Sequence, residues 1–94
     1  MQELRLPELV EKEFIANFTF KNETHFQVNP QLRKKLKDAT GLGNLEKVKF
    51  QIDFLADSGP KSVQTTIWAT GSQFICLKGG LWIPISKIID IKYI

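Results

Sequence analysis

Cysteine and histidine are almost missing from this chain, which has Cys76 and His25 as the single residue of each type. One cysteine cannot form a disulfide within the chain, and Cys76 stands in an apolar run, so we expect it in the core. A histidine without other histidines or cysteines at ligand spacing does not indicate a zinc site. The sequence therefore predicts no metal.

Long apolar runs are also missing, since no stretch reaches the ~18 residues that a membrane-spanning helix needs. The first residues, Met1 to Glu13, are acidic and interrupted by Pro7. A secretion signal would instead be basic and then apolar. We expect a cytoplasmic protein with no membrane partner.

Recognisable catalytic motifs are absent as well. Gly41-Leu42-Gly43 and Gly79-Gly80 lack the Lys-Ser/Thr continuation or the following helix of a phosphate-binding loop. Neither a Ser-His-Asp set nor a suitably spaced pair of carboxylates stands out. The sequence predicts no enzyme and no small-molecule cofactor.

The composition is that of an ordinary globular protein, with 94 residues, 43% hydrophobic and 24% charged. Such a length predicts a single domain, residues 1–94, because two separate cores would each be too small. The net charge of +3 is uneven: three basic and five acidic residues precede Pro30, whereas seven basic and four acidic residues occupy positions 30–61. A partner attracted by positive charge would meet the middle of the chain first.

Alternation of apolar and polar residues predicts short strands over most of the chain. Turn residues such as Gly71-Ser72 and Gly79-Gly80 separate them, which is typical of antiparallel hairpins. The turn or short loop Ala56 to Lys61 is expected to join the strands on either side of it in an antiparallel pair. The sequence leaves open which face of the strand containing Trp68 is buried; if the smaller apolar set points inward, Trp68 is displayed. The expected strands are residues 14–20 and 25–28 (a first hairpin), 46–55, 63–69, 74–77 (apolar on both faces and so covered on both sides), 81–83 and 88–94.

One main helix is expected at about residues 30–40. Asn29-Pro30 is a typical start, Leu32 and Leu36 lie one turn apart, and Gly41 and Gly43 are expected to end it. A short N-terminal helix within Leu6 to Glu13 and a single helical turn at Pro84 to Lys87 are also expected. The predicted fold is mainly β (α+β): a small, strongly bent antiparallel sheet or barrel of about six to seven short strands with one basic helix.

The basic residues of this helix are Arg33, Lys34, Lys35 and Lys37. They could contact a phosphate backbone. They could equally form the solvated face of an amphipathic helix, with their aliphatic stems covering the leucines.

The order of elements between Ile67 and Ile91 resembles the second half of Sm-like and SH3-like small barrels, and in particular Rho-binding antiterminator proteins. The residues that carry this resemblance are the Gly71-Ser72 turn, Phe74-Ile75-Cys76-Leu77, Gly79-Gly80, Ile83-Pro84-Ile85 and Ile88-Ile89. The resemblance implies binding of RNA or of an RNA-handling protein, often by a homo-oligomer, without catalysis. A helix that follows a hairpin departs from the pattern of a helix preceding all strands, so the topology of the first half stays open.

Two functions remain. The first is a non-enzymatic protein-interaction or assembly module that pairs with a partner, or with itself, through strand edges and exposed aromatics such as Trp82. The alternative is an antiterminator-like RNA-binding or single-stranded nucleic-acid-binding module. In that case Arg33, Lys34, Lys35 and Lys37 contact phosphates while Trp68 or Trp82 stacks on a base.

Overall fold

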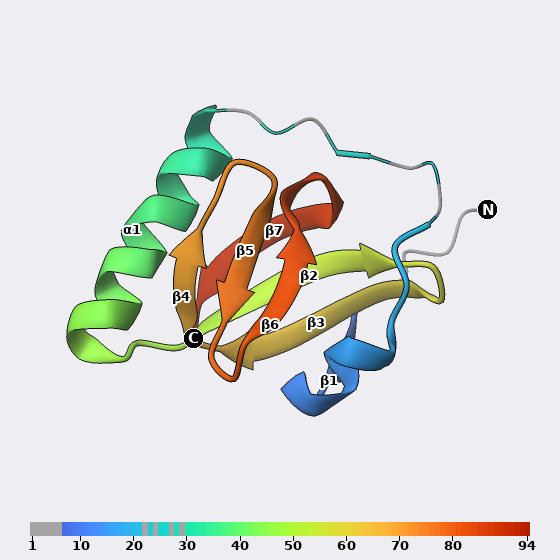
Figure 1. Ribbon diagram of the computed structural model, residues 1–94, viewed down its shortest axis with the longest axis horizontal. Coiled ribbons are helices and arrows are strands. Elements are labelled where there is room, and N and C mark those ends of the chain that lie inside the picture. Colours follow the sequence, from blue (N-terminus) through green and yellow to red (C-terminus); the bar gives the residue numbers. More distant parts are fainter. Residues whose placement is uncertain (1–6, 22, 24, 27, 29) are drawn as a thin grey trace.

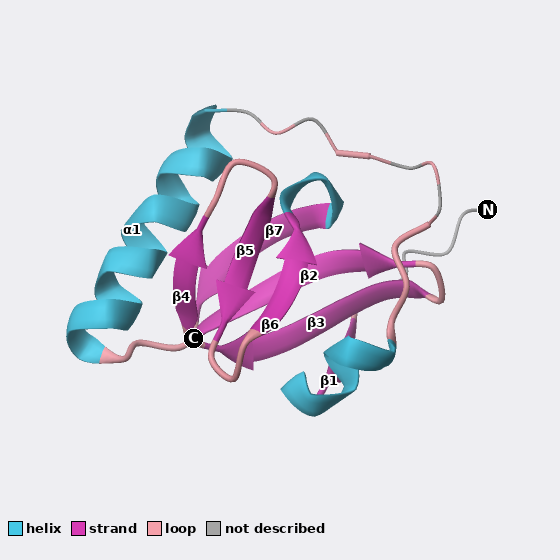
Figure 2. Ribbon diagram, in the orientation of Figure 1, coloured by secondary structure: helices cyan, strands magenta, loops and turns pink. Residues whose placement is uncertain are grey.

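The computed structural model describes residues 7–21, 23, 25, 26, 28 and 30–94 of the chain. Within these residues it contains one α-helix, two 3-10 helices and seven strands (Figures 1 and 2). In chain order they are β1 (Glu8–Val10), η1 (Lys12–Asn17), α1 (Pro30–Glu46), β2 (Phe50–Ala56), β3 (Gly59–Thr65), β4 (Ile67–Thr70), β5 (Phe74–Leu77), β6 (Leu81–Pro84), η2 (Ile85–Lys87) and β7 (Ile88–Tyr93).

The strands form two sheets. Sheet A has the order β1-β3-β2-β7 and sheet B the order β4-β5-β6. All pairs are antiparallel except β1, which runs parallel to β3. The mixed α+β class is confirmed, as are the hairpin of β2 and β3, the helical turn η2 and the last strand. The two sheets are not joined into a closed barrel by the strand pairs of the described residues.

A bend at Thr66 divides the strand that was predicted at residues 63–69. Thr66 alone separates β3 from β4, and the two strands belong to different sheets. Sheet B crosses over sheet A in Figure 1. A strand that changes sheets at such a corner lets two twisted sheets cover each other's apolar faces. The prediction of one continuous strand was therefore wrong at this position.

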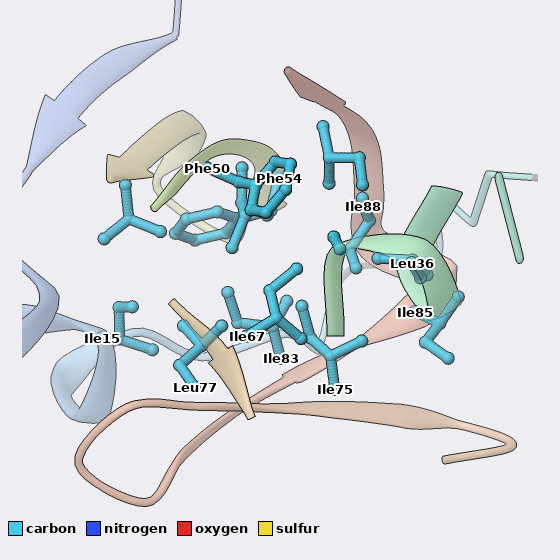
Figure 3. Close-up of a cluster of buried hydrophobic side chains, with 14 of the residues drawn as sticks. Ile15, Leu36, Phe50, Phe54, Ile67, Ile75, Leu77, Ile83, Ile85 and Ile88 are labelled. Carbon is cyan, nitrogen blue, oxygen red and sulfur yellow. The ribbon is translucent and has the colours of Figure 1, made fainter. Parts of the chain in front are cut away.

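The core lies between the two sheets and is closed by helix α1 (Figure 3). Sheet A contributes Phe50, Ile52 and Phe54, which alternate as predicted. The strand starts at Phe50 and not at residue 46, which belongs to α1, and Asp53 on the opposite face is buried too. Sheet B contributes the buried set Ile67, Ile75, Leu77 and Ile83. Ile85 and Ile88, from η2 and β7, complete the packing around Leu36.

Helix α1 is longer than predicted, because neither Gly41 nor Gly43 ends it. Its buried positions are Leu32, Leu36, Ala39 and Gly43, which follow one stripe of a helix. A Cβ on Gly43 would lie 2.6 Å from the carbonyl oxygen of Ile67, so glycine allows α1 to approach β4 closely. Lys47 ends the helix instead, with φ of 57° and an N–H that donates to the Gly43 carbonyl at 3.0 Å.

The N-terminal part differs most from the predictions. No described residue of the expected first hairpin, 14–20 and 25–28, lies in a strand. Ile15 is buried and Phe14 is exposed within η1, a 3-10 helix in place of the expected strand. Phe18 and Phe20 pack on the Phe54 ring, with centroids 6.2 and 6.0 Å apart. The edge of β3 that a hairpin could have joined is occupied by β1, where a helix had been expected.

Candidate functional site

The outer face of sheet B displays aromatic side chains to solvent. Strand alternation buries Ile75 and Ile83 and turns their neighbours outward, and an irregularity in the pairing of β4 between Ile67 and Ala69 leaves both Trp68 and Ala69 exposed. The exposed fractions are 46% for Trp68, 44% for Phe74 and 57% for Trp82. Trp68 is therefore on the displayed side, which the sequence had left open. We call Trp68, Phe74 and Trp82, with the smaller Ala69, Cys76 and Pro84 in register among them, the aromatic face.

Two predictions for β5 need correction at this face. The strand is central in sheet B, as expected, but it is covered by protein on one side only, because Phe74 is exposed. Cys76 was expected in the core and is instead half-buried on the outer face, opposite Ala69 on one side and Trp82 on the other. An alternating strand places Cys76 on the side opposite Ile75 and Leu77, which fill the core.

The Phe74 and Trp82 rings meet edge to face, with an interplanar angle of 87°. Next to Phe74 lies a hollow of about 290 Å³, which we call the apolar hollow. Apolar side chains supply most of its lining. The described residues around it are Val28, Ser72, Gln73, Phe74, Pro84, Ile85 and Ser86.

At the other end of sheet B, Trp68 borders a second hollow of about 220 Å³, which we call the cationic hollow. Its described lining consists of Gly43, Asn44, Lys47, Thr66, Trp68 and Lys78. The Asn44 side-chain amide donates to the Trp68 carbonyl at 3.3 Å and so ties the end of α1 to β4. Neither Lys47 nor Lys78 has an ion-pair partner among the described residues.

Helix α1 does not present its four basic residues as one surface. Successive helical residues turn by about 100°, so Arg33 and Lys37 lie on the side of sheet B, and Lys34 points away from the core. The Arg33 guanidinium donates to the Ser72 carbonyl at 3.1 Å, beside the aromatic face. Lys35 lies on the other side, where its Nζ pairs with the Asp90 carboxylate at 3.2 Å.

Sequence analysis missed Phe74, Lys47 and Lys78 as members of this site. Phe74 belongs to a run that is apolar at every position, so alternation could not show which side faces solvent. The two lysines are far apart in sequence and line one hollow because α1 ends beside the turn between β5 and β6. No signal in the sequence could have brought them together.

Beyond sheet B, the described residues raise the question of metal sites, membrane-spanning helices and further hollows. They contain no group of three or more histidine, cysteine, aspartate or glutamate side chains that could hold a metal ion. No helix among them is long and apolar enough to cross a membrane. A hollow of about 320 Å³ beside η1 is lined by Glu11 and Glu13 as well as by Lys12, Lys49 and Lys78, so it favours neither sign of ligand charge.

Comparison of the chain with known protein families, with curated proteins and with solved structures found no match. The geometry of sheet B therefore provides the basis for a functional assignment.

Proposed function

We propose that this protein is a non-enzymatic interaction module that binds another protein through the aromatic face of sheet B. One observation carries the proposal: Trp68, Phe74 and Trp82 are each at least 44% exposed on one small sheet. Tryptophan is the residue type most enriched among the side chains that dominate binding energy at protein interfaces.

The distribution of charge on this surface is also that of a protein interface. No charged residue lies within the aromatic face, while Arg33, Lys47 and Lys78 lie at its margins. Protein interfaces have an aromatic centre depleted of charge and a polar rim. The strand edges that the sequence suggested contribute less to the proposal, because Thr40 and Asn44 of α1 bond to residues of β4 along one edge of sheet B.

The resemblance to Sm-like and SH3-like barrels is part of the same proposal. Because the described residues of the predicted first hairpin form no strands, α1 precedes every strand except β1. The last strand, β7, follows η2 and pairs back with β2. Both features support the resemblance, although the described strands form two sheets and not one bent sheet or a closed barrel.

Site-specific photocrosslinking tests the proposal. A benzophenone amino acid replaces Trp82 in one variant and Gln64, an exposed residue of β3 outside the aromatic face, in the control. After irradiation of cells that make the protein, we expect adducts from position 82 alone, removed by protease and resistant to nuclease. Equal adducts from both positions, or none from position 82, would reject the aromatic face as the binding surface.

A second copy of the chain is one candidate partner. Sedimentation velocity of the purified protein at low and high salt tests self-association directly. An apolar interface should persist at high salt, because screening weakens charge pairs and leaves the burial of apolar surface favourable. A Trp82→Ser variant should remain monomeric if the copies meet through the aromatic face.

Single-stranded RNA is a second candidate, favoured by the absence of acidic residues between Asp57 and Asp90. Bases could stack on Trp68 or Trp82 while Arg33 and Lys37 contact phosphates. Binding of a fluorescent oligouridylate would then weaken with salt, with a log–log slope of about −1.4 for two phosphate contacts at ~0.7 per contact. Charge reversal at Arg33 and Lys37 should abolish it, and nuclease-sensitive adducts from position 82 would favour this function over protein binding.

A further inference from the structure

The aromatic face connects two hollows of opposite character. The apolar hollow adjoins Phe74, and the cationic hollow adjoins Trp68 and Lys78. We infer that the protein partner supplies an extended acidic segment, with an apolar side chain in the apolar hollow and a carboxylate between Lys47 and Lys78. This inference rests on the proposed protein-binding function and specifies the chemistry of its partner.

Charge complementarity is the first argument. Lys47 and Lys78 line one hollow, and neither is paired with a carboxylate of the described residues. None of the described residues that line this hollow is acidic, and the carboxylates across Lys78 are Glu11 and Glu13 of the hollow beside η1, which Lys78 also lines without forming an ion pair there. The C-terminal end of α1 contributes a partial negative charge of about half a unit, which the two full positive charges exceed. A single carboxylate from a partner would complete this site.

The number and position of the cations favour a carboxylate over a polyphosphate chain. A nucleic-acid strand requires a row of positive charges along its backbone. Here Lys34 faces away from sheet B, Lys35 is paired with Asp90, and Arg33 is held by the Ser72 carbonyl. Lys37 is then the one cation of α1 on the side of sheet B with no partner among the described residues, and a single charge does not make a row. The unpaired positive charge of the site is concentrated at Lys47 and Lys78, at one end of the aromatic face.

The distance between the hollows sets the spacing of the partner's residues. Phe74 and Lys78 are four residues apart in the chain, along β5 and the turn that follows it. At ~3.3 Å per residue this corresponds to about 13 Å. An extended partner segment advances by the same amount per residue, so its apolar and acidic residues should be separated by about four positions. The aromatic face then covers the residues between them.

Selection from a random peptide library tests this inference with the full-length chain as bait. The probe is a phage-displayed library of linear peptides about twelve residues long, which exceeds the span of the face at ~3.3 Å per residue. We expect enriched peptides to combine an apolar residue with an aspartate or glutamate at the predicted spacing. A bait carrying both Lys47→Glu and Lys78→Glu should instead enrich lysine or arginine at that position.

Affinity measurements on one enriched peptide provide the matched comparison. Replacement of its acidic residue by glutamine should weaken binding to the unmodified protein at least about tenfold, as for a charge-assisted hydrogen bond. The same replacement should have little effect on binding to the Lys47→Glu, Lys78→Glu protein. Lys34→Glu is the control variant, since Lys34 is exposed on the far side of α1 and should not alter the selection.

The outcomes separate this inference from the proposed function. Peptides that depend on Trp82 but show no acidic preference would overturn the inference and leave the aromatic face as a binding surface. Acidic peptides whose affinity is unchanged by Lys47→Glu and Lys78→Glu would overturn it too, as would the absence of any enriched sequence. Failure of the proposed function would appear separately, in the photocrosslinking at position 82.

Discussion

The Phe74 and Trp82 rings meet edge to face with their centroids 6.5 Å apart, on the solvent side of adjacent strands. Their neighbours Ile75 and Ile83 are completely buried on the other side of the same strands. The face of sheet B that carries the aromatic pair therefore has a role distinct from that of the core face, and substitutions can separate the two.

Phe74→Ala should cost little stability compared with Ile75→Ala, one position along β5. Loss of the exposed aromatic pair removes about 0.5–1.5 kcal/mol. Truncation of the buried Ile75 leaves a cavity and should cost about 2–5 kcal/mol. Urea denaturation monitored by circular dichroism measures both values. A cost for Phe74→Ala equal to that for Ile75→Ala would show that Phe74 belongs to the core rather than to a binding surface.

Gly43→Ala should destabilise the protein by about 1–3 kcal/mol, the usual cost of forcing additional atoms into a packed contact. The new Cβ would meet the Ile67 carbonyl oxygen at 2.6 Å and the Thr66 methyl at 2.8 Å, and backbone cannot yield easily. In a domain of this size each kcal/mol lowers Tm by about 4–8 °C.

Gly41→Ala is the matched control for Gly43. It lies two residues earlier in the same helix, and a Cβ there would meet nothing within 4 Å. Alanine should stabilise α1 at this position by about 0.5–1 kcal/mol through helix propensity. A higher Tm for Gly43→Ala than for Gly41→Ala would contradict the close approach of α1 to β4.

Lys47→Gly should stabilise the fold while weakening partner binding. Lys47 has φ of 57°, a left-handed conformation that costs a residue with a Cβ about 1–2 kcal/mol. Glycine is the preferred residue at this position after a helix. Part of the gain is offset by the greater freedom of glycine in the unfolded chain, so we expect a net gain of about 0.5–1 kcal/mol.

Lys49→Gly is the comparison for this prediction, because Lys49 is also exposed and its φ is not positive. It should destabilise the protein slightly. Thermal denaturation of the two variants, with peptide binding measured in parallel, gives both readouts. If Lys47→Gly and Lys49→Gly destabilise the protein equally, Lys47 does not adopt the left-handed conformation.

Lys61→Ala should weaken the attachment of the N-terminal segment to sheet A. The buried Lys61 ammonium lies 5.5 Å from the Phe18 ring centroid and 3.3 Å from the Glu8 carboxylate. Loss of its aliphatic stem and of the cation–π contact should cost about 1–2 kcal/mol. Hydrogen exchange should be faster at β1 and η1 than in the unmodified protein.

Glu8→Gln separates the ion pair from the packing of Lys61. The Glu8 side chain is 67% exposed and the Lys61 side chain 11%, so water still screens the pair from the side of Glu8 and we expect it to contribute about 1 kcal/mol. We therefore expect Glu8→Gln to change stability less than Lys61→Ala. Equal exchange rates in the two variants would mean that the ion pair, and not burial of the stem, holds the segment.

The sequence alone predicted the elements whose patterns are local and strong. Alternation of Phe50, Ile52 and Phe54 predicted β2 and its buried face, and Pro30 marked the first residue of α1. The turn before Gly59, the helical turn η2 and the final strand were also predicted, because turn residues and short apolar runs suffice to indicate them. Among the candidate site residues, the sequence indicated Trp82 and the basic residues of α1. It did not indicate that those basic residues lie on different sides of the helix.

Tertiary contacts decided the rest. Alternation shows which residues share a face, but not which face another layer will cover, so only the packing of sheet B on sheet A turned Trp68 and Phe74 outward. Gly43 continues α1 because close contact with Ile67 offsets the poor helix propensity of glycine. Lys47 and Lys78 line one hollow beside Trp68 because β4 turns away after Thr66 and α1 ends there, and no pattern along the chain encodes the proximity of segments so far apart.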